Sequence, residues 1–201
     1  LSGPNLAREI LGGQAAASVL AMDDPAIMGQ LQPLFSSGLF RVYTNDDIAG
    51  CELGGVLKNV IAIACGMGDG MGAGDNPRAA MITRGLAEIT RLGTALGGKA
   101  ETFAGLAGMG DLVTTCASPL SRNRCVGEQL GRGRAIADIV REMRTVAEGV
   151  WSAPVIVELA TRHGVEVPMM REVSRVLAGG NMKQAFRALL RISAGAETDP
   201  G

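Results

Sequence analysis

Residues 48–65 read IAGCELGGVLKNVIAIAC, an apolar stretch long enough for about five helical turns. Its apolar positions are nearly continuous, and Asn45, Asp46 or Asp47 just upstream can cap a helix. We therefore expect one long buried helix here. Downstream the apolar periodicity stays helical, and Gly and Pro separate the helical segments. Further helices are expected over 76–97, 101–107, 121–130, 135–143, 151–163, 168–178 and 181–192.

Upstream of this helix the periodicity changes. Residues 15–22 (AAASVLAM) and 40–44 (FRVYT) are typical of strands. A single strand–helix–strand unit cannot bury a sheet by itself, so this part of the chain is expected to end a larger doubly wound sheet. Between the strands, Asp23-Asp24-Pro25 resembles a helix start. The apolar face of that helix would consist of Ile27, Leu31 and Leu34.

The two patterns divide the chain into three parts. Residues 1–47 form the sheet remnant, 48–193 form an all-helical domain, and 194–201 are expected to be a frayed tail, so the fold class is mainly α. The chain opens on Leu1-Ser2-Gly3-Pro4, without Met and a basic region. We therefore expect no signal peptide and treat the chain as a piece of a longer protein.

The composition argues against several classes of function. Of the 201 residues 47% are hydrophobic and 19% charged, which allows a sizeable core. The formal net charge of -1 gives no general reason to expect nucleic acid or an anionic membrane as partner, and no charge-free apolar run indicates a membrane span. One histidine and four cysteines without a CxxC pair argue against a metal site. Cys51 and Cys65 lie in apolar stretches and are expected to be reduced, as in the cytoplasm.

Lys58 and Asn59 interrupt the long apolar helix. Burying an ammonium is costly, and a lysine in this setting can exchange a proton near neutral pH. The alternative is a lysine whose stem lies along the helix while its charge reaches solvent, which is common at the edge of an apolar face. Gly54 and Gly55, one turn earlier, indicate close approach by a ligand or another backbone.

Two further segments present polar groups after turn residues. Residues 108–116 (GMGDLVTTC) bring Asp111 and two hydroxyls into an apolar segment, where an acid beside Lys58 would hold its charge. The alternative is an ordinary helix cap by Asp111. Residues 118–124 (SPLSRNR) combine a hydroxyl, guanidinium groups, an amide and free backbone N–H groups, which suit a phosphate. The alternative there is a capped, solvated helix end.

Residues 66–77 (GMGDGMGAGDNP) are rich in glycine but lack the lysine of a Walker loop, and they follow an apolar helix instead of a strand. We interpret them as an irregular connection between helices, in which Asp69 and Asp75 are caps and not ligands. Trp151 is expected to anchor helix packing.

Taken together, these segments resemble a known family. They are, in order, SGPNLARE (2–9), GGVLKNVIAIACGMGDG (54–70), RGLAEITRLG (84–93), GMGDLVTTC (108–116), SRNR (121–124) and VAEGV (146–150). In this combination they resemble the NAD(P)-dependent glycerol-3-phosphate dehydrogenases of bacterial type, over almost the whole chain. LKNV together with GDLVTTC and SRNR is highly specific, whereas each alone is not.

The resemblance implies a fold and a reaction. The family joins an N-terminal Rossmann domain to an all-helical C-terminal domain of the 6-phosphogluconate-dehydrogenase type, so residues 1–47 would end the first domain. Its members interconvert sn-glycerol 3-phosphate and dihydroxyacetone phosphate with NAD or NADP and supply glycerol 3-phosphate for phospholipid synthesis. The main cofactor-binding motif would lie in an N-terminal part absent from this chain. The chain alone is therefore expected to lack full activity.

The resemblance also implies roles for single residues. Lys58 would be the general acid/base on the C2 oxygen, and the residues shaping the same catalytic site would be Asn59, Asp111 and Thr115. The expected substrate contacts are Gly3, Asn5, Lys58, Asp111, Ser121, Arg122 and Asn123. The expected cofactor contacts are Ala7, Arg122, Val146 and Glu148. Asn5 departs from the Ser or Thr more usual at its position, which puts the geometry of that contact in question.

Two alternatives stay open at this point. The helical domain of another dehydrogenase, of the 3-hydroxyacyl or 6-phosphogluconate type, would also place polar groups near a nicotinamide. A non-enzymatic helical interaction domain would bind no phosphate. The residues of this chain determine neither the preference between NAD and NADP nor the oligomeric state, for which a homodimer is one option.

Overall fold

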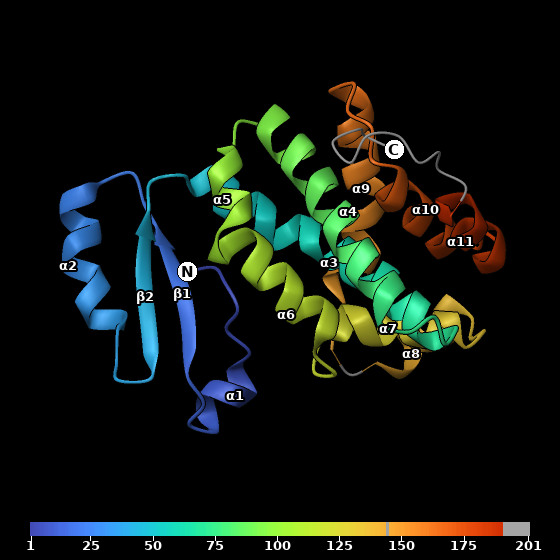
Figure 1. The fold of residues 1–201 in the computed structure, drawn as a ribbon, viewed down its shortest axis with the longest axis horizontal. Helices are drawn as coiled ribbons and strands as arrows, with labels where there is room; N and C mark the ends of the chain where they lie inside the picture. The colour runs from blue at the N-terminus through green and yellow to red at the C-terminus, as the bar shows by residue number, and fades with distance from the viewer. Residues whose placement is uncertain (144, 191–201) are drawn as a thin grey trace.

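A small sheet with its helices stands beside a larger assembly of helices (Figure 1). The computed structural model describes residues 1–143 and 145–190. The expected class, mainly α with a short strand–helix–strand unit in front, is confirmed for this part of the chain. In order, the elements are α1 (Ala7–Leu11), β1 (Ala16–Ala21), α2 (Pro25–Phe35), β2 (Phe40–Asn45), α3 (Ile48–Gly70), α4 (Asp75–Ala95), α5 (Ala100–Ala104), a π-helical turn η1 (Leu106–Gly110), α6 (Asp111–Ala117), α7 (Arg122–Gly131), α8 (Ile136–Glu142), α9 (Glu148–Arg162), α10 (Pro168–Leu177) and α11 (Met182–Leu190).

The strand–helix–strand unit forms close to its expected bounds. β1 and β2 are parallel, with Ala16 opposite Phe40, and α2 covers them on the outside (Figure 1). Asp24 caps the start of α2 by accepting two backbone N–H bonds. On the other edge of β1, Ser2 makes an antiparallel bridge to Val19. The N-terminal segment therefore lies between the sheet and the helical domain.

The sheet covers α2 only partly. Ile27 and Leu34 of its apolar face are 46% and 77% exposed, and no residue of α2 is buried. The reason is geometric, because two strands offer too narrow a face to cover a helix of this length. The short helix α1 is an addition to the elements that the sequence pattern predicted.

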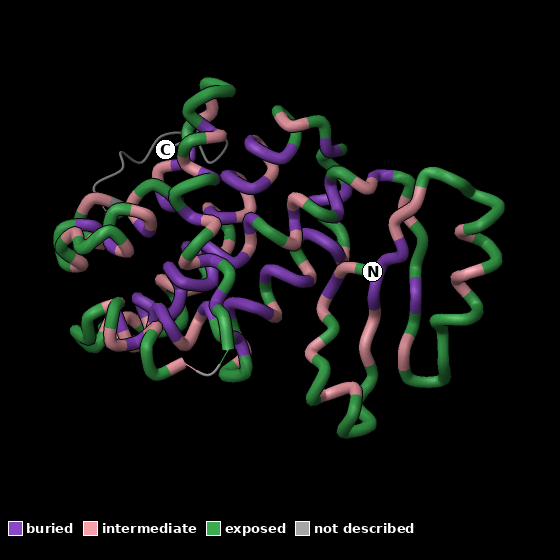
Figure 2. Tube along the Cα trace, turned by 180° about the vertical axis from the view of Figure 1, so that it is seen from behind, coloured by how far each residue is buried: buried purple, intermediate pink, exposed green. Residues whose placement is uncertain are grey.

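α3 is the central helix of the helical domain, and burial is concentrated along it (Figure 2). Its N-cap is Asp47, whose Oδ1 accepts from the N–H of Gly50 at 2.8 Å and whose Oδ2 accepts from the N–H of Lys99 at 2.7 Å. α3 has the length and mean hydropathy (1.5) of a membrane span, but 61% of its apolar window is buried inside the molecule, as in the core helix of a helical domain. The expected long buried helix is confirmed.

α3 continues to Gly70, past its expected end at Cys65, so the interpretation of residues 66–77 as an irregular connection is wrong for the first part of that run. A Cβ atom at Gly66 would stand 2.0 Å from the carbonyl oxygen of Arg124 on α7, so the two helices touch backbone to backbone. This close packing offsets the low helix propensity of glycine. The glycines of this α3–α7 seam are Gly66, Gly70, Gly127 and Gly131.

The two acids of the glycine run are not the caps that we expected. Asp69 lies inside α3, and Asp75 is the first residue of α4, whose N-cap is Gly74. Both carboxylates form ion pairs with Arg78 instead. Helix geometry explains the difference, because the continuation of α3 turns Asp69 toward the neighbouring helices.

One expected helix is broken. The pattern predicted a single helix over 101–107, but α5 ends at Ala104 and the chain is extended at Gly105 before η1 begins. Gly108 in η1 packs against α5, where a Cβ atom would stand 2.1 Å from the carbonyl oxygen of Phe103. The π-helical turn therefore folds the chain tightly back on α5 and leads directly into α6.

Glu88 of α4 binds the start of α10, a helix that has no side-chain cap of its own. Its two carboxylate oxygens accept from the N–H groups of Met169 and Met170 at 2.7 and 3.1 Å. Burial raises the pKa of Glu88 to about 7, although these donors and the charges of Arg91 and Arg84 act in the opposite direction. α4 and α10 are thus joined by a buried carboxyl group.

α6 (Asp111–Ala117) is a helix that the apolar pattern did not predict, whereas α4 and α7 to α10 begin and end within a few residues of their predicted bounds. α11 begins at Met182, close to its predicted start, and its predicted end at 192 lies outside the described residues. The described residues after position 47 form no strand. Trp151 does not anchor helix packing, since it is 64% exposed. The buried face of α9 carries Ala153, Ile156 and Ala160, and this face points away from the indole. The predicted tail over 194–201 lies outside the described residues.

Candidate active site

Lys58 of α3 and Asp111 of α6 form an ion pair, as the sequence predicted. The two side chains are only 16% and 8% exposed, so Lys58 is not a lysine reaching for solvent. Thr115 donates from Oγ1 to Oδ1 of Asp111 at 3.3 Å. Burial raises the pKa of Asp111, while the charge of Lys58 and hydrogen bonds from Lys58 and Thr115 oppose that change. Asp111 is not the N-cap of α6, a position that Gly110 holds without a side-chain bond.

The N-terminal segment lies beside this ion pair. Ser2 donates from Oγ to the carbonyl oxygen of Cys51 on α3 at 3.4 Å. A Cβ atom at Gly110, the residue immediately before Asp111, would stand 3.6 Å from the ring of Pro4, an ordinary van der Waals distance. The segment therefore contacts α3 near its start and the residue that precedes α6.

Gly3 and Asn5, two of the expected substrate contacts, belong to this segment. Gly3 is buried with a φ of 137°, a conformation that glycine adopts readily. Asn5 is exposed, and its Nδ2 donates to Oγ of Ser18 at 3.1 Å. Ser18 in turn donates to the carbonyl oxygen of Ser2 at 3.0 Å. These bonds hold the loop to β1, and direct substrate contact by either residue stays a prediction.

A hydrogen-bonded chain joins the other expected residues across three helices. Asn59 donates from Nδ2 to Oε2 of Glu148 at 3.4 Å and accepts at Oδ1 from Nδ2 of Asn123 at 3.0 Å. Oδ1 of Asn123 accepts from the N–H of Gly149 at 2.9 Å. The exposed residue Glu148, an expected cofactor contact, is thereby bound to the helix that carries Lys58.

The start of α7 presents polar groups to solvent. Ser121 caps the helix by accepting the N–H of Arg124 at Oγ, at 3.3 Å, so the capping alternative describes this hydroxyl correctly. Within residues 1–143 and 145–190, the exposed guanidinium of Arg122 has no ion-pair or hydrogen-bond partner, and the backbone N–H groups of Arg122 and Asn123 have no acceptor. A free cation and free N–H groups at a helix N-terminus suit an anion.

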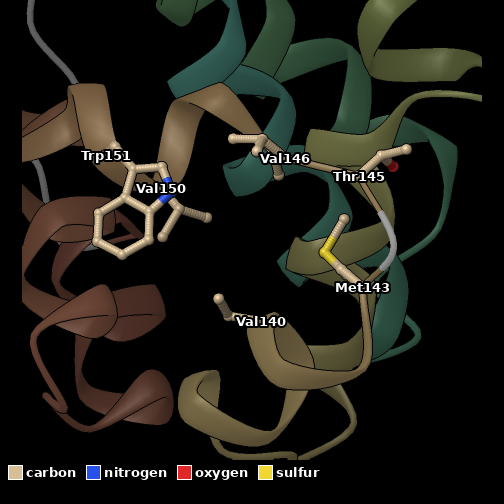
Figure 3. Close-up of a pocket in the computed structure, with 7 residues that line it drawn as sticks. Val140, Met143, Thr145, Val146, Val150 and Trp151 are labelled. Atoms are coloured by element: carbon tan, nitrogen blue, oxygen red, sulfur yellow. The ribbon is translucent and has the colours of Figure 1, made fainter.

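Ala7 and Val146, the two remaining expected cofactor contacts, take no part in the side-chain hydrogen bonds described above. Ala7 is the exposed first residue of α1. Val146 is 59% exposed and lines an apolar pocket of about 160 Å³ with Val140, Met143 and Trp151 (Figure 3). Because Val146 comes just before α9, the pocket adjoins the first turn of that helix, where Glu148 lies.

Sequence reasoning missed one polar cluster at the far end of α3. Asp69 binds Arg78 of α4 and Arg124 of α7 there, and its side chain is 7% exposed. A sequence signal existed, since Asp69 follows Lys58 by about three helical turns and so lies on nearly the same face of α3. The glycines around Asp69 concealed that signal, because they suggested a loop.

Fold and site together define a class of protein, the helical domain that follows the last strands of a doubly wound sheet and holds a largely buried lysine–carboxylate pair. Residues 47–187 match the family model described as the NAD-dependent glycerol-3-phosphate dehydrogenase C-terminus. The chain belongs to this family. The alternative classes, another dehydrogenase type or an interaction domain, are not favoured.

Curated relatives agree with this assignment. The chain is 64% identical over 202 residues to glycerol-3-phosphate dehydrogenase (NAD(P)+) 2 of Sphingopyxis alaskensis, a match that covers 100% of this chain and 61% of the relative. It is 53% identical over 191 residues to glycerol-3-phosphate dehydrogenase (NAD(P)+) 1 of Mycobacterium tuberculosis, covering 94% of this chain and 56% of that protein. The chain thus spans less than two thirds of the length of these relatives.

Solved structures show the same fold. Glycerol-3-phosphate dehydrogenase from Coxiella burnetii superposes with a TM-score of 0.91 at 41% identity, over 94% of this chain and 59% of that one. The glycerol-3-phosphate dehydrogenase of Saccharomyces cerevisiae superposes with a TM-score of 0.81 at 29% identity, over 92% of this chain and 57% of that one.

Proposed function

We propose that this chain is the helical, substrate-binding part of an NAD(P)-dependent enzyme that interconverts sn-glycerol 3-phosphate and dihydroxyacetone phosphate. The observation that carries the proposal is the largely buried Lys58–Asp111 ion pair. Its lysine lies on α3, the helix that Asn123 joins to the open N-terminus of α7. Membership of the family and the names of its relatives support the reaction. Because the chain covers 61% of the Sphingopyxis relative, we infer that a nucleotide-binding part precedes it in the complete enzyme.

Lys58 would handle the proton of this reaction. The nicotinamide cofactor supplies or takes the hydride at C2. As an ammonium, Lys58 donates a proton to the C2 oxygen during reduction, and as an amine it takes that proton back during oxidation. The ion pair with Asp111 fixes the direction of the Lys58 side chain, and the bond from Thr115 holds Asp111 in turn.

The first turn of α7 would bind the substrate phosphate. Arg122 has a guanidinium without a protein partner among the described residues. The free N–H groups of Arg122 and Asn123 lie at the N-terminus of α7, which is the positive end of the helix dipole. The hydroxyl of Ser121 accepts one backbone bond and still has a proton to donate. These groups together suit a phosphate dianion.

The residues present also fit a dinucleotide that is bound mainly elsewhere. Glu148 is exposed beyond its bond to Asn59, so its carboxylate can accept from hydroxyl or amide groups of the cofactor. Ala7 and Val146 are exposed and can make apolar contacts. This chain would thus contribute the rim of the cofactor site, while the phosphate-binding glycine turn belongs to the preceding part.

The test is a turnover assay of the complete enzyme. Oxidation of NADH or NADPH should depend on dihydroxyacetone phosphate, and dihydroxyacetone should be a far poorer substrate because it lacks the phosphate. Turnover that does not distinguish these two ketones, or a preference for a hydroxyacyl substrate, would contradict the proposal.

Location and assembly are further parts of the proposal. We propose a cytoplasmic enzyme that supplies glycerol 3-phosphate for phospholipid synthesis, and the four free cysteines support a reducing compartment. We also propose a homodimer, which the exposed apolar residues Trp151 and Val155 on α9 (64% and 62% exposed) support. Light scattering on the complete enzyme tests this assembly, and a monomeric mass would contradict it.

A further inference from the structure

Asp69 binds two arginines from two different helices. Arg78 of α4 donates from Nε and Nη2 to Oδ1 at 2.9 and 2.7 Å. Arg124 of α7 donates from Nε to Oδ2 at 2.8 Å, and its Nη2 lies 2.7 Å from the same oxygen. The Asp69 side chain is 7% exposed, so solvent screens these pairs weakly. We call Asp69, Arg78 and Arg124 the Asp69 clamp.

The clamp acts on the turn that presents the phosphate-binding groups. The N–H of Arg124 donates to the cap oxygen of Ser121, and its neighbour Asn123 is bonded to Asn59 of α3. On the other side, the Arg124 carbonyl oxygen packs directly on Gly66. α7 therefore cannot rotate about its axis without breaking the bonds to Asp69.

The clamp also determines which arginine of the SRNR segment stays free. Arg122 and Arg124 are two residues apart on a helix, so their side chains point about 200° apart. Asp69 and Glu128 bind Arg124, which is 14% exposed, whereas Arg122 is exposed. The positive charge available to a ligand is thereby placed at Arg122.

We propose that Asp69 is a positioning residue, which through Arg124 fixes the first turn of α7 so that Arg122 and the free N–H groups meet the substrate phosphate. The inference rests on the proposed function. Because Asp111 holds Lys58 independently, loss of the clamp should weaken substrate binding more than it slows proton transfer.

The central experiment is Asp69→Asn in the complete enzyme. We expect a roughly tenfold rise in KM for glycerol 3-phosphate, the scale of a displaced binding group, with a much smaller change in kcat. Asp75→Asn is the matched control, because it removes the other, 90% exposed partner of Arg78 and should leave KM unchanged.

Two further variants separate positioning from a general loss of stability. Arg124→Gln cuts the same link from the α7 side, should raise KM similarly, and should add little in combination with Asp69→Asn. In an Arg122→Ala background, Asp69→Asn should raise KM far less than in the wild type. If the fold-changes in KM of the single variants simply multiply in both double variants, the inference is overturned.

The failure of the inference can be told from failure of the proposed function. A complete wild-type enzyme without turnover of dihydroxyacetone phosphate refutes the function, and the inference falls with it. An active wild type whose Asp69→Asn and Arg124→Gln variants keep a normal KM, even at a lower melting temperature, overturns the positioning role alone. If Asp69→Asn does not fold, the KM of Arg124→Gln decides the question.

Discussion

Asn123 on α7 donates from Nδ2 to Oδ1 of Asn59 on α3 at 3.0 Å, so a buried hydrogen bond joins the turn that carries Arg122 to the helix that carries Lys58. The same amide accepts from the N–H of Gly149 at the start of α9. Three helices therefore meet at the side chain of Asn123.

Replacing this amide should destabilise the domain. We expect Asn123→Ala to lower the free energy of unfolding by about 1–3 kcal/mol, because Asn59 and the N–H of Gly149 would lose buried partners. Chemical denaturation measures the change. Asn76→Ala, at an exposed position of α4, is the control and should shift stability by less than about 0.5 kcal/mol. Equal losses for both variants would argue against a special role of the amide.

Removing the amine should stop turnover without unfolding the protein. In the complete enzyme, Lys58→Met fills a similar volume and should reduce kcat by roughly 100-fold or more, the usual scale for a positioned proton donor. Lys99→Met is the control, because Lys99 is 47% exposed and pairs with Asp46 at the surface. Near-normal turnover in a folded Lys58→Met enzyme would refute the mechanism.

Removing the free guanidinium should weaken substrate binding. In the complete enzyme, Arg122→Ala should cost about 2 kcal/mol or more of binding free energy for glycerol 3-phosphate, the scale of a charge-assisted contact. Steady-state kinetics should show this loss of binding free energy as a raised KM for glycerol 3-phosphate. Arg141→Ala removes a surface arginine that pairs with Asp138 and should behave as the wild type. An unchanged KM and kcat in Arg122→Ala would count decisively against the phosphate site.

A methyl group in the α3–α7 seam should force the two helices apart. A Cβ atom at Gly127 would stand 2.0 Å from the carbonyl oxygen of Ile63, so Gly127→Ala should cost about 1–3 kcal/mol or more of stability. At Gly29 in α2 nothing lies within 4 Å, and Gly29→Ala should be neutral or slightly stabilising. Thermal unfolding of the pair tests the seam, and similar melting temperatures would contradict it.

Glu88 should make stability depend on pH. Because the pKa of Glu88 rises from 4.5 to about 7 on folding, its contribution is fully present below pH 4.5 and is lost as the pH rises to about 7. Glu88→Gln lacks this titration. The melting temperature of the wild type minus that of Glu88→Gln should therefore fall between pH 4.5 and about 7 and then level off. A difference that stays constant or grows with pH would show that the group is not protonated in the folded state.

The sequence by itself determined the elements whose signals are local. Apolar periodicity and a choice of capping residues predicted the start and the buried character of α3, and Asp47 proved to be its cap. Polar residues inside apolar segments drew attention to Lys58 and Asp111, and the resemblance to a family assigned them to one site. The structure places these two in contact.

Only the tertiary structure decided what depends on contacts between distant segments. Glycine has low helix propensity, so no local pattern could extend α3 to Gly70; the backbone of α7 packed against it supplies the reason. The same contact turns Asp69 toward Arg124, which commits one arginine of the SRNR segment and leaves Arg122 free. Helix periodicity fixes which side chains share a face, but which partner covers that face depends on how the helices pack.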